Sequence, residues 1–249
     1  GFVMRRRMAS PVFGEFVGTT VLVLMGDGVV GGVLLRGSKA ANAGWMVITA
    51  GWAFAVFVGV VTAVAFGSPG ADLNPAVTLA AAIHSGNYSH LVPFALAQTL
   101  GAIFGATLVW LFYHPHWPLT EDASAKLAVF CTAPAIRSRF WNFFCEALAT
   151  AVLLLAIAAI GSKTFAAAGP APGLAPYLVA IVVWGIGLSL GGTTGYAINP
   201  ARDLGPRIAH AILPVAGKGG SDWGYALVPI LGPLVGAALI GICLRLTGI

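Results

Sequence analysis

The stretches GSPGADLNPAVTLAAAIH (residues 67–84) and GGTTGYAINPARDLGPRIAHAILP (residues 191–214) share the triplet Asn-Pro-Ala. Asn is a favoured helix N-cap and Pro is favoured at the first helical position, so each triplet predicts the start of a helix. The apolar segment after each triplet is shorter than the roughly 20 residues that a bilayer-crossing helix needs. A Gly-rich, poorly helical stretch precedes each one. The sequence therefore predicts two half-helices, each entered through a re-entrant loop.

The composition is that of a protein embedded in lipid. Of its 249 residues, 58% are hydrophobic and 8% are charged, and the mean hydropathy is +0.91. Ordinary globular proteins carry roughly 25% charged residues. So few charges cannot cover a water-facing surface, which excludes a soluble domain, a disordered chain and a nucleic-acid-binding protein. The net charge of +5 is spread too thinly to indicate a nucleic-acid partner. Three cysteines predict no disulfide framework.

Six further segments are apolar enough to be predicted as membrane spans. The one at 174–190 is the shortest, and it ends in a Gly-rich break rather than at a charge. We therefore expect an all-α membrane protein with six transmembrane helices and two re-entrant half-helices. The predicted spans are Pro11–Leu35, Trp45–Phe66, Leu91–Tyr113, Phe140–Gly161, Leu174–Leu190 and Tyr225–Leu244.

The two halves of the chain repeat one another. Glu15 matches Glu146 at a spacing of 131 residues, and the Asn-Pro-Ala triplets match at a spacing of 125. Thr19 and Thr150, Gly101 and Gly232, and Gly105 and Gly236 also match at 131. The first repeat is 11–113 with its half-helix at 74–84, the second is 140–246 with its half-helix at 199–214, and 114–139 is expected as a connecting loop. Because each repeat holds three spans, an odd number, the second must enter the membrane from the opposite side.

An inverted repeat brings the two half-helices together by their N-termini at the membrane midplane. Each N-terminus carries roughly half a positive charge, and the amides of Asn74 and Asn199 add hydrogen-bond donors. Such a centre suits neutral, oxygen-bearing molecules and repels cations. Glu15 and Glu146 are costly inside a membrane, and we expect them to accept the unpaired backbone N–H groups of the re-entrant loops. The alternative interpretation is a proton relay in a coupled transporter.

Two Asn-Pro-Ala triplets on inverted half-helices, with Glu15 and Glu146 at matching positions, resemble the aquaporin and glycerol-facilitator family from Gly14 to Leu244. The resemblance implies a passive channel rather than an enzyme, with no cofactor and no metal, assembled as a homotetramer with one pore per subunit. The pore centre would comprise Asn74, Pro75, Ala76, Asn199, Pro200 and Ala201. Further positions resemble the glycerol-conducting branch of the family, namely Trp110, Asp203, Arg207, Pro233 and Leu234.

By the same resemblance, the narrowest ring comprises Trp52, Gly187, Tyr196 and Arg202. Arg202 offers a rigid fork of donors to hydroxyl oxygens, and it keeps its charge at any physiological pH. Trp52 and Tyr196 would form an apolar corner for the carbon chain of a polyol, and Gly187 would leave the slot wide. Tyr196 stands where Phe is commoner, which leaves the preference between glycerol and water open.

A ladder of backbone carbonyls along the pore is also expected from the resemblance. It would comprise the carbonyls of Gly70, Ala71, Asp72 and Leu73 and of Thr194, Gly195, Tyr196 and Ala197. Asp72 stands where His is usual. It is either a solvated carboxylate with no special role or an acid that attracts cations or titrates at the inner mouth.

Two other motifs are set aside. Gly26–Gly31 matches G-x-G-x-x-G, but it ends a membrane span and follows no strand, so it does not predict a nucleotide site. His114 and His116, with Glu121 and Asp122 nearby, are interpreted as an exposed polar loop rather than a metal site.

The predicted function is a passive channel for glycerol and other small neutral polyols, and also for water, that excludes ions and protons. The alternatives are a strict water channel and a proton-coupled secondary transporter. The basic cluster Arg5–Arg7 favours a cytosolic N-terminus, and six spans would put the C-terminus on the same side of the plasma membrane.

Overall fold

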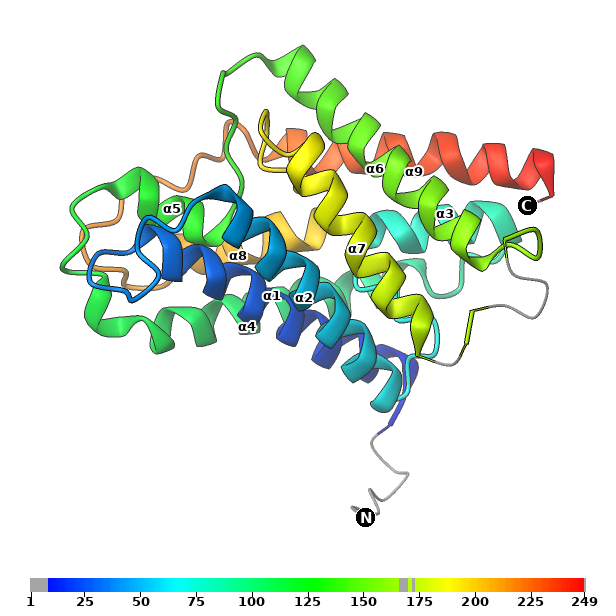
Figure 1. Ribbon diagram of the computed structural model, residues 1–249, viewed down its shortest axis with the longest axis horizontal. Coiled ribbons are helices and arrows are strands. Elements are labelled where there is room, and N and C mark those ends of the chain that lie inside the picture. Colours follow the sequence, from blue (N-terminus) through cyan, green and yellow to red (C-terminus); the bar gives the residue numbers. More distant parts are fainter. Residues whose placement is uncertain (1–8, 166–169, 172, 249) are drawn as a thin grey trace.

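The structure is a computed structural model that describes residues 9–165, 170–171 and 173–248. Within these residues the fold is all-helical, and the helices lie alongside one another as an elongated bundle (Figure 1). The helices are α1 (Pro11–Leu34), α2 (Trp45–Ala65), α3 (Pro75–Ser85), α4 (Leu91–Phe112), the 3-10 helix η1 (His114–His116), α5 (Ala123–Phe130), α6 (Arg139–Gly161), α7 (Leu174–Ser189), α8 (Pro200–Ile212) and α9 (Leu227–Thr247).

All six predicted spans are helices. Five of them, α1, α2, α4, α6 and α9, are long and apolar enough to cross a membrane. The sixth, α7, is apolar but has only 16 residues. At 1.5 Å per residue it is about 24 Å long, less than the roughly 30 Å of a bilayer's hydrocarbon core. It packs along α2, beside which it runs in Figure 1.

The two repeats interlock through their half-helices. In the first repeat α1 packs against α2 and α4, and in the second α6 packs against α7 and α9. Each half-helix crosses to the other repeat, so that α3 packs against α9 and α8 against α4. The repeats therefore form one bundle rather than two domains.

Matching glycines allow the closest of these helix contacts. A Cβ on Gly101 would lie 2.4 Å from the carbonyl oxygen of Phe16, and a Cβ on Gly236 would lie 2.3 Å from that of Ala147. No side chain fits at either position, so the backbones of α4 and α1, and of α9 and α6, meet directly. These repeat-related glycines therefore pack within the subunit.

The segment 114–139, expected as a loop, contains η1 and α5. The side chain of Asp122 accepts a hydrogen bond from the backbone N–H of Ser124 at 2.7 Å and so caps α5. The helix buries Val129 and Phe130 and packs against α1 and α8. It therefore covers one end of the bundle beside the second half-helix.

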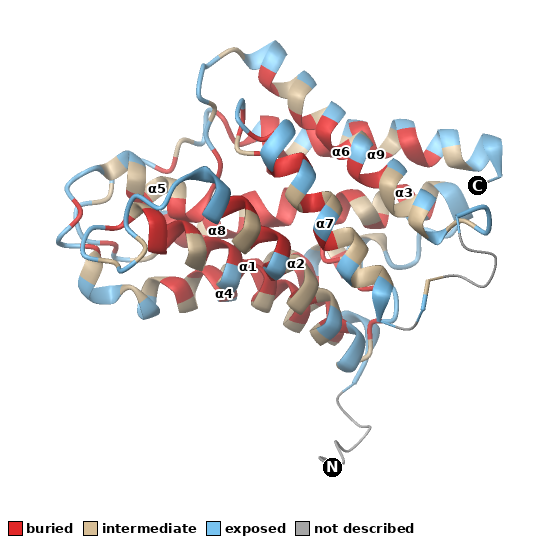
Figure 2. Ribbon diagram, viewed as in Figure 1, coloured by how far each residue is buried: buried red, intermediate tan, exposed pale blue. Residues whose placement is uncertain are grey.

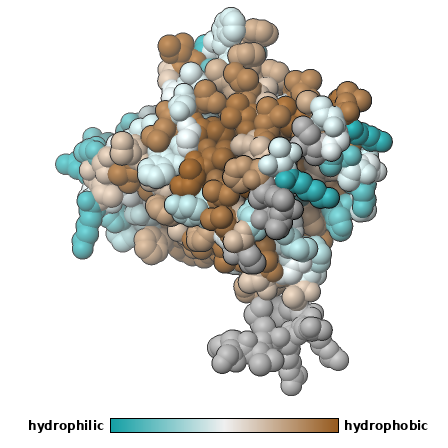
Figure 3. Space-filling view, turned by 45° about the vertical axis from the view of Figure 1, so that its right-hand side comes forward, coloured by the Kyte–Doolittle hydropathy of each residue, from teal (hydrophilic) through white to brown (hydrophobic). Residues whose placement is uncertain are grey.

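The outer surface of the bundle is apolar. Buried residues gather along the central helices, α1 and α8 among them, in Figure 2, whereas Figure 3 shows hydrophobic side chains across the middle of the molecule and hydrophilic ones toward its ends. Large apolar side chains that are half exposed or more include Phe54, Leu96, Leu100 and Leu239. Because water would not favour such a surface, it is suited to contact lipid.

Candidate functional site: the meeting point of the half-helices and the constriction beside it

The two half-helices meet at their N-caps. The side-chain oxygen of Asn74 accepts from the N–H of Ala76 at 2.9 Å, and that of Asn199 accepts from the N–H of Ala201 at 3.0 Å. The Nδ2 of Asn74 donates to the carbonyl of Ile198 at 2.7 Å, and the Nδ2 of Asn199 donates to the carbonyl of Leu73 at 2.8 Å. Each amide thus ties its own half-helix to the opposite loop and keeps a second N–H for another acceptor.

Two buried glutamates hold the re-entrant loops. Glu15 on α1 accepts from the backbone N–H groups of Asp72 at 2.9 Å and Leu73 at 2.7 Å. Ser68 Oγ (2.6 Å) and Gln98 Nε2 (2.8 Å) donate to the same carboxylate. Sequence analysis singled out neither Ser68 nor Gln98, because an isolated Ser or Gln gives no sequence signal.

Glu146 on α6 does the same for the second loop. It accepts from the backbone N–H groups of Ala197 at 3.0 Å and Ile198 at 2.8 Å. Glu15 and Glu146 are both fully buried. Their oxygens receive donors 125 residues apart in the chain, at positions that the repeat relates to one another.

The loops carry matching backbone strain. Ala71 and Leu73 have φ of 45° and 52°, and Tyr196 and Ile198 have φ of 38° and 42°. A left-handed conformation costs a non-glycine residue roughly 1–2 kcal/mol. Such strain persists where the surroundings fix the backbone, as the bonds to Glu15 and Glu146 do here.

A cavity of about 630 Å³ opens beside the loops and contacts α2, α6 and α7. We call it the central cavity. It reaches Asn74 and Asn199, and its lining includes Trp52, Tyr196 and Arg202. These three residues are called the constriction below. Most of the other lining side chains are apolar, including Leu22, Val56, Val60, Leu153, Ile157, Val179 and Val183.

Residues of both re-entrant loops line the central cavity. Gly70, Ala71, Asp72 and Leu73 line the central cavity, and so do Tyr196, Ala197 and Ile198. Thr194 and Gly195 are not among the described residues that line it; Thr194 is buried, and Gly195 faces Thr132. The carbonyl of Leu73 is already bonded to Asn199.

The Tyr196 ring lies in the space beside Gly187, which was expected to leave the slot wide. A Cβ at this position would lie 2.8 Å from Cζ and 2.9 Å from Oη of Tyr196. The tyrosine therefore occupies the space beside Gly187, and its ring also packs edge-on against Trp45, with centroids 5.8 Å apart. Trp45 Nε1 donates to the Gly187 carbonyl at 2.9 Å, and this bond fixes the Trp45 indole beside the Tyr196 ring.

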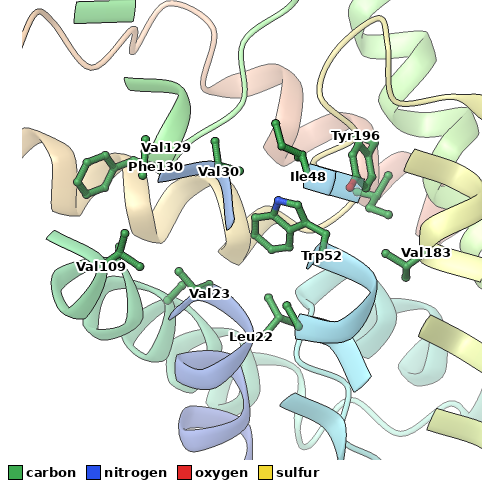
Figure 4. Packing of buried hydrophobic residues seen from close by; sticks show 14 of the residues in the cluster. Leu22, Val23, Val30, Ile48, Trp52, Val109, Val129, Phe130, Val183 and Tyr196 are labelled. Carbon is green, nitrogen blue, oxygen red and sulfur yellow. The ribbon is translucent and has the colours of Figure 1, made fainter. Parts of the chain in front are cut away.

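Trp52 contacts Arg202 directly. The guanidinium carbon of Arg202 lies 4.1 Å from the centroid of the Trp52 ring, a cation–π contact that leaves no space between the two. Figure 4 shows Trp52 and Tyr196 among the buried side chains around Ile48 and Val183.

The positions that resemble glycerol-conducting members lie behind the central cavity. Asp203 and Arg207 form a fully buried ion pair at 2.8 Å, and Asp203 also accepts from the N–H of Thr132 at 2.8 Å. Arg207 donates to the carbonyls of Thr132 (3.0 Å) and Ser221 (2.8 Å), so the pair ties two distant segments to α8. Trp110 on α4 and Pro233 and Leu234 on α9 lie within helices away from the central cavity.

One buried acid escaped the sequence analysis. Asp27 on α1 is fully buried, and its Oδ1 lies 3.9 Å from Nη1 of Arg202. The signal was an acid inside a membrane span, which usually marks a functional site. Sequence analysis considered only the glycines around it. Across 9–165, 170–171 and 173–248, no group of three His, Cys, Asp or Glu residues could hold a metal ion.

Comparison with known proteins agrees with this geometry. A family model described as major intrinsic protein matches residues 4–244. The chain belongs to the major intrinsic protein family. It is 54% identical over 239 residues to glycerol uptake facilitator protein 3 of Lactiplantibacillus plantarum, covering 95% of this chain and 96% of that protein. It is 51% identical to a probable glycerol uptake facilitator protein of Thermotoga maritima, covering 92% of this chain and 96% of that one.

The fold agrees as well. The aquaglyceroporin of Plasmodium falciparum matches with a TM-score of 0.81 and 27% identity, covering 94% of both chains. Membership of the major intrinsic protein family and this structural match confirm the resemblance inferred from the Asn-Pro-Ala triplets and the aquaporin-like membrane fold predicted with it.

Proposed function

We propose that the protein is a passive channel for glycerol and other small neutral polyols, that it also conducts water, and that it excludes ions and protons. The observation that carries the proposal is the meeting of two half-helix N-termini at Asn74 and Asn199, on a cavity whose lining includes Arg202. The names of the relatives support glycerol as the permeant.

The electrostatics of the centre favour neutral molecules. Two helix N-termini each contribute roughly half a positive charge, and the free N–H of each asparagine amide adds a donor. A hydroxyl or water oxygen can accept these donors, whereas a cation, including hydronium, meets positive potential. The positive ends of half-helices exclude protons in this way in aquaporin-type channels.

The constriction supplies selectivity by pairing apolar surface with donors. Arg202 lines the central cavity, and Arg202 Nη1 has no hydrogen-bond partner among the described residues. We assign to the guanidinium groups that face the cavity the role of donors to a permeant hydroxyl. The Tyr196 ring and the apolar wall of α7 face the carbon chain. A polyol therefore passes beside the Arg202–Trp52 stack, with its hydroxyls toward the guanidinium and its carbons toward Tyr196.

The two alternatives fit less well. A proton-coupled transporter would need a glutamate that exchanges protons with the pathway, but both glutamates are fully buried and bonded to loop backbone. A strict water channel would need a constriction lined by polar groups, whereas this one is largely aromatic. We further propose a homotetramer in the plasma membrane with both termini in the cytosol, by resemblance to the family and from the basic cluster at the N-terminus. No cofactor and no nucleic-acid partner form part of the proposal.

The test is glycerol uptake into proteoliposomes, with and without an imposed pH gradient. A channel brings internal glycerol to the external concentration and no further, at a rate that does not depend on the gradient. Accumulation above the external concentration under a pH gradient would support the transporter instead. Fast water flux without glycerol uptake would support the strict water channel.

A further inference from the structure

Asp27 and Arg202 are a buried acid and a buried base whose facing atoms lack hydrogen-bond partners among the described residues. Both carboxylate oxygens of Asp27 and Nη1 of Arg202 are without a partner among the described residues. The side chain of Asp27 is 0% exposed and that of Arg202 is 8% exposed. At 3.9 Å from Arg202 Nη1, Asp27 Oδ1 lies within ion-pair distance of the guanidinium.

The neighbouring buried charges are already satisfied. Asp203 and Arg207 pair with each other at 2.8 Å, and both bond to the backbone around them. Asp203 is therefore committed to Arg207, which leaves Asp27 to balance Arg202. An isolated ion in a low-dielectric interior is costly, so the two unpaired charges stabilise each other.

Gly26 allows the fold to bring Asp27 and Arg202 close together. A Cβ on Gly26 would lie 2.2 Å from Cζ3 of Trp52, so the indole ring lies directly on the α1 backbone. Arg202 lies over the same ring at 4.1 Å and reaches toward Asp27, the residue after Gly26. Three helices thus fix one guanidinium: α1 through Asp27, α2 through Trp52 and α8 through its own backbone. Within the Gly26–Gly31 motif, Gly26 serves this packing.

We propose that Asp27 is a specificity-determining positioning residue, which acts through Arg202. It holds the guanidinium on Trp52 and offsets its charge. The constriction then presents N–H donors to hydroxyl oxygens while carrying little net charge, and it attracts neutral polyols without attracting anions. Asp27 does not line the central cavity, so it touches no permeant. The inference rests on the proposed role of Arg202 in the constriction.

The direct test is Asp27→Asn, which removes the charge and keeps the size. Nitrate permeability, measured in proteoliposomes with a potassium nitrate gradient and valinomycin, is compared with glycerol permeability in the same preparation. An uncompensated Arg202 attracts the anion, and we expect the nitrate-to-glycerol ratio to rise about tenfold, equivalent to about 1.4 kcal/mol. An unchanged ratio in a variant that still conducts glycerol would overturn the proposal.

The matched control is Asp222→Asn. Asp222 forms an ion pair with Arg137 at 2.6 Å, and both side chains are exposed to solvent in part. The chemical change is the same, but it lies outside the constriction, and we expect the nitrate-to-glycerol ratio of the unaltered protein. A rise equal to that of Asp27→Asn would show that any lost acid has this effect, which would also overturn the proposal.

A double-variant cycle shows whether Asp27 acts through Arg202. In an Arg202→Val background, Asp27→Asn is expected to leave the ratio unchanged, and a second tenfold rise there would contradict the mechanism. If Asp27→Asn alone does not fold, Asp27→Asn/Arg202→Gln removes both charges and is expected to restore folded protein; its failure would count against the pairing. Loss of glycerol flux in the unaltered protein would instead refute the proposed function.

Discussion

Gly187→Ala isolates the contribution of the Tyr196 ring to the constriction. The added methyl would lie 2.8 Å from Thr49 Cγ2 and from Tyr196 Cζ, and 2.9 Å from Tyr196 Oη. An ordinary contact begins at 3.4 Å, so the ring must move by roughly 0.6 Å. Trp45 and Gly191 block the ring on the α7 side, where a Cβ on Gly191 would already lie 2.5 Å from Cδ1. The ring therefore moves into the central cavity.

The size of the effect follows from the cost of overpacking. One extra methyl group in a packed site costs about 1–3 kcal/mol. If glycerol must push the displaced ring back as it passes, the same energy raises its barrier. A barrier higher by that amount lowers glycerol permeability by roughly 5- to 150-fold. Water is narrower than glycerol, and we expect its permeability to change by less than about twofold.

The assay is glycerol and water permeability in proteoliposomes, with Gly185→Ala as the matched control. Gly185 lies on the same helix, and a Cβ there would meet nothing within 4 Å. The control is expected to match the unaltered protein for both solutes. Normal glycerol permeability in folded Gly187→Ala would refute the placement of Tyr196 beside the permeation path.

Three further substitutions test other contacts of the site. Tyr196→Phe removes a buried hydroxyl that has no hydrogen-bond partner among the described residues, so we expect no loss of thermal stability and sustained glycerol flux; a lower melting temperature in detergent would contradict this. Glu15→Gln replaces one carboxylate oxygen with an NH2 group, which then faces two of the four donors that Glu15 now accepts. We expect it to lower the free energy of unfolding by at least about 2 kcal/mol, seen as a lower melting temperature. Arg202→Val removes the guanidinium from the constriction and leaves Asp27 without its proposed counter-ion, and we expect the proton leak of proteoliposomes to rise about tenfold; an unchanged leak would argue against Arg202 as part of the barrier.

The features that could be predicted from the sequence are those set by short local motifs or by the internal repeat. Each Asn-Pro-Ala triplet contains its own N-cap and its own proline, so both half-helix starts could be located without tertiary information. The matched positions of Glu15 and Glu146 indicated partners in the matched loops. Both features depend on short-range rules or on the repeat, and either can be read from one chain.

The packing of side chains from distant segments of the chain could not be predicted from the sequence. Gly187 was expected to leave open space, but Tyr196, Gly191 and Trp45 together fill it. Arg202 was expected to face an aromatic wall across a slot, but it lies on Trp52 because Gly26 lets the indole approach α1. No pattern within one segment encodes such packing.

The helix α5 in the connecting segment 114–139 could not be predicted from local sequence either. Its helix α5 has only eight residues, a length at which neither periodicity nor propensity is informative. The one local signal was Asp122 two residues before Ser124, which also occurs in ordinary turns. What stabilises α5 is the burial of Val129 and Phe130 against helices elsewhere in the chain.

The most direct test of passive polyol conduction is stopped-flow light scattering on proteoliposomes, run once with an impermeant osmolyte and once with a glycerol gradient. We predict fast shrinkage in the first run, and shrinkage followed by rapid re-swelling in the second, both with low activation energy and no dependence on pH. Glycerol re-swelling no faster than in protein-free liposomes would contradict the proposed function.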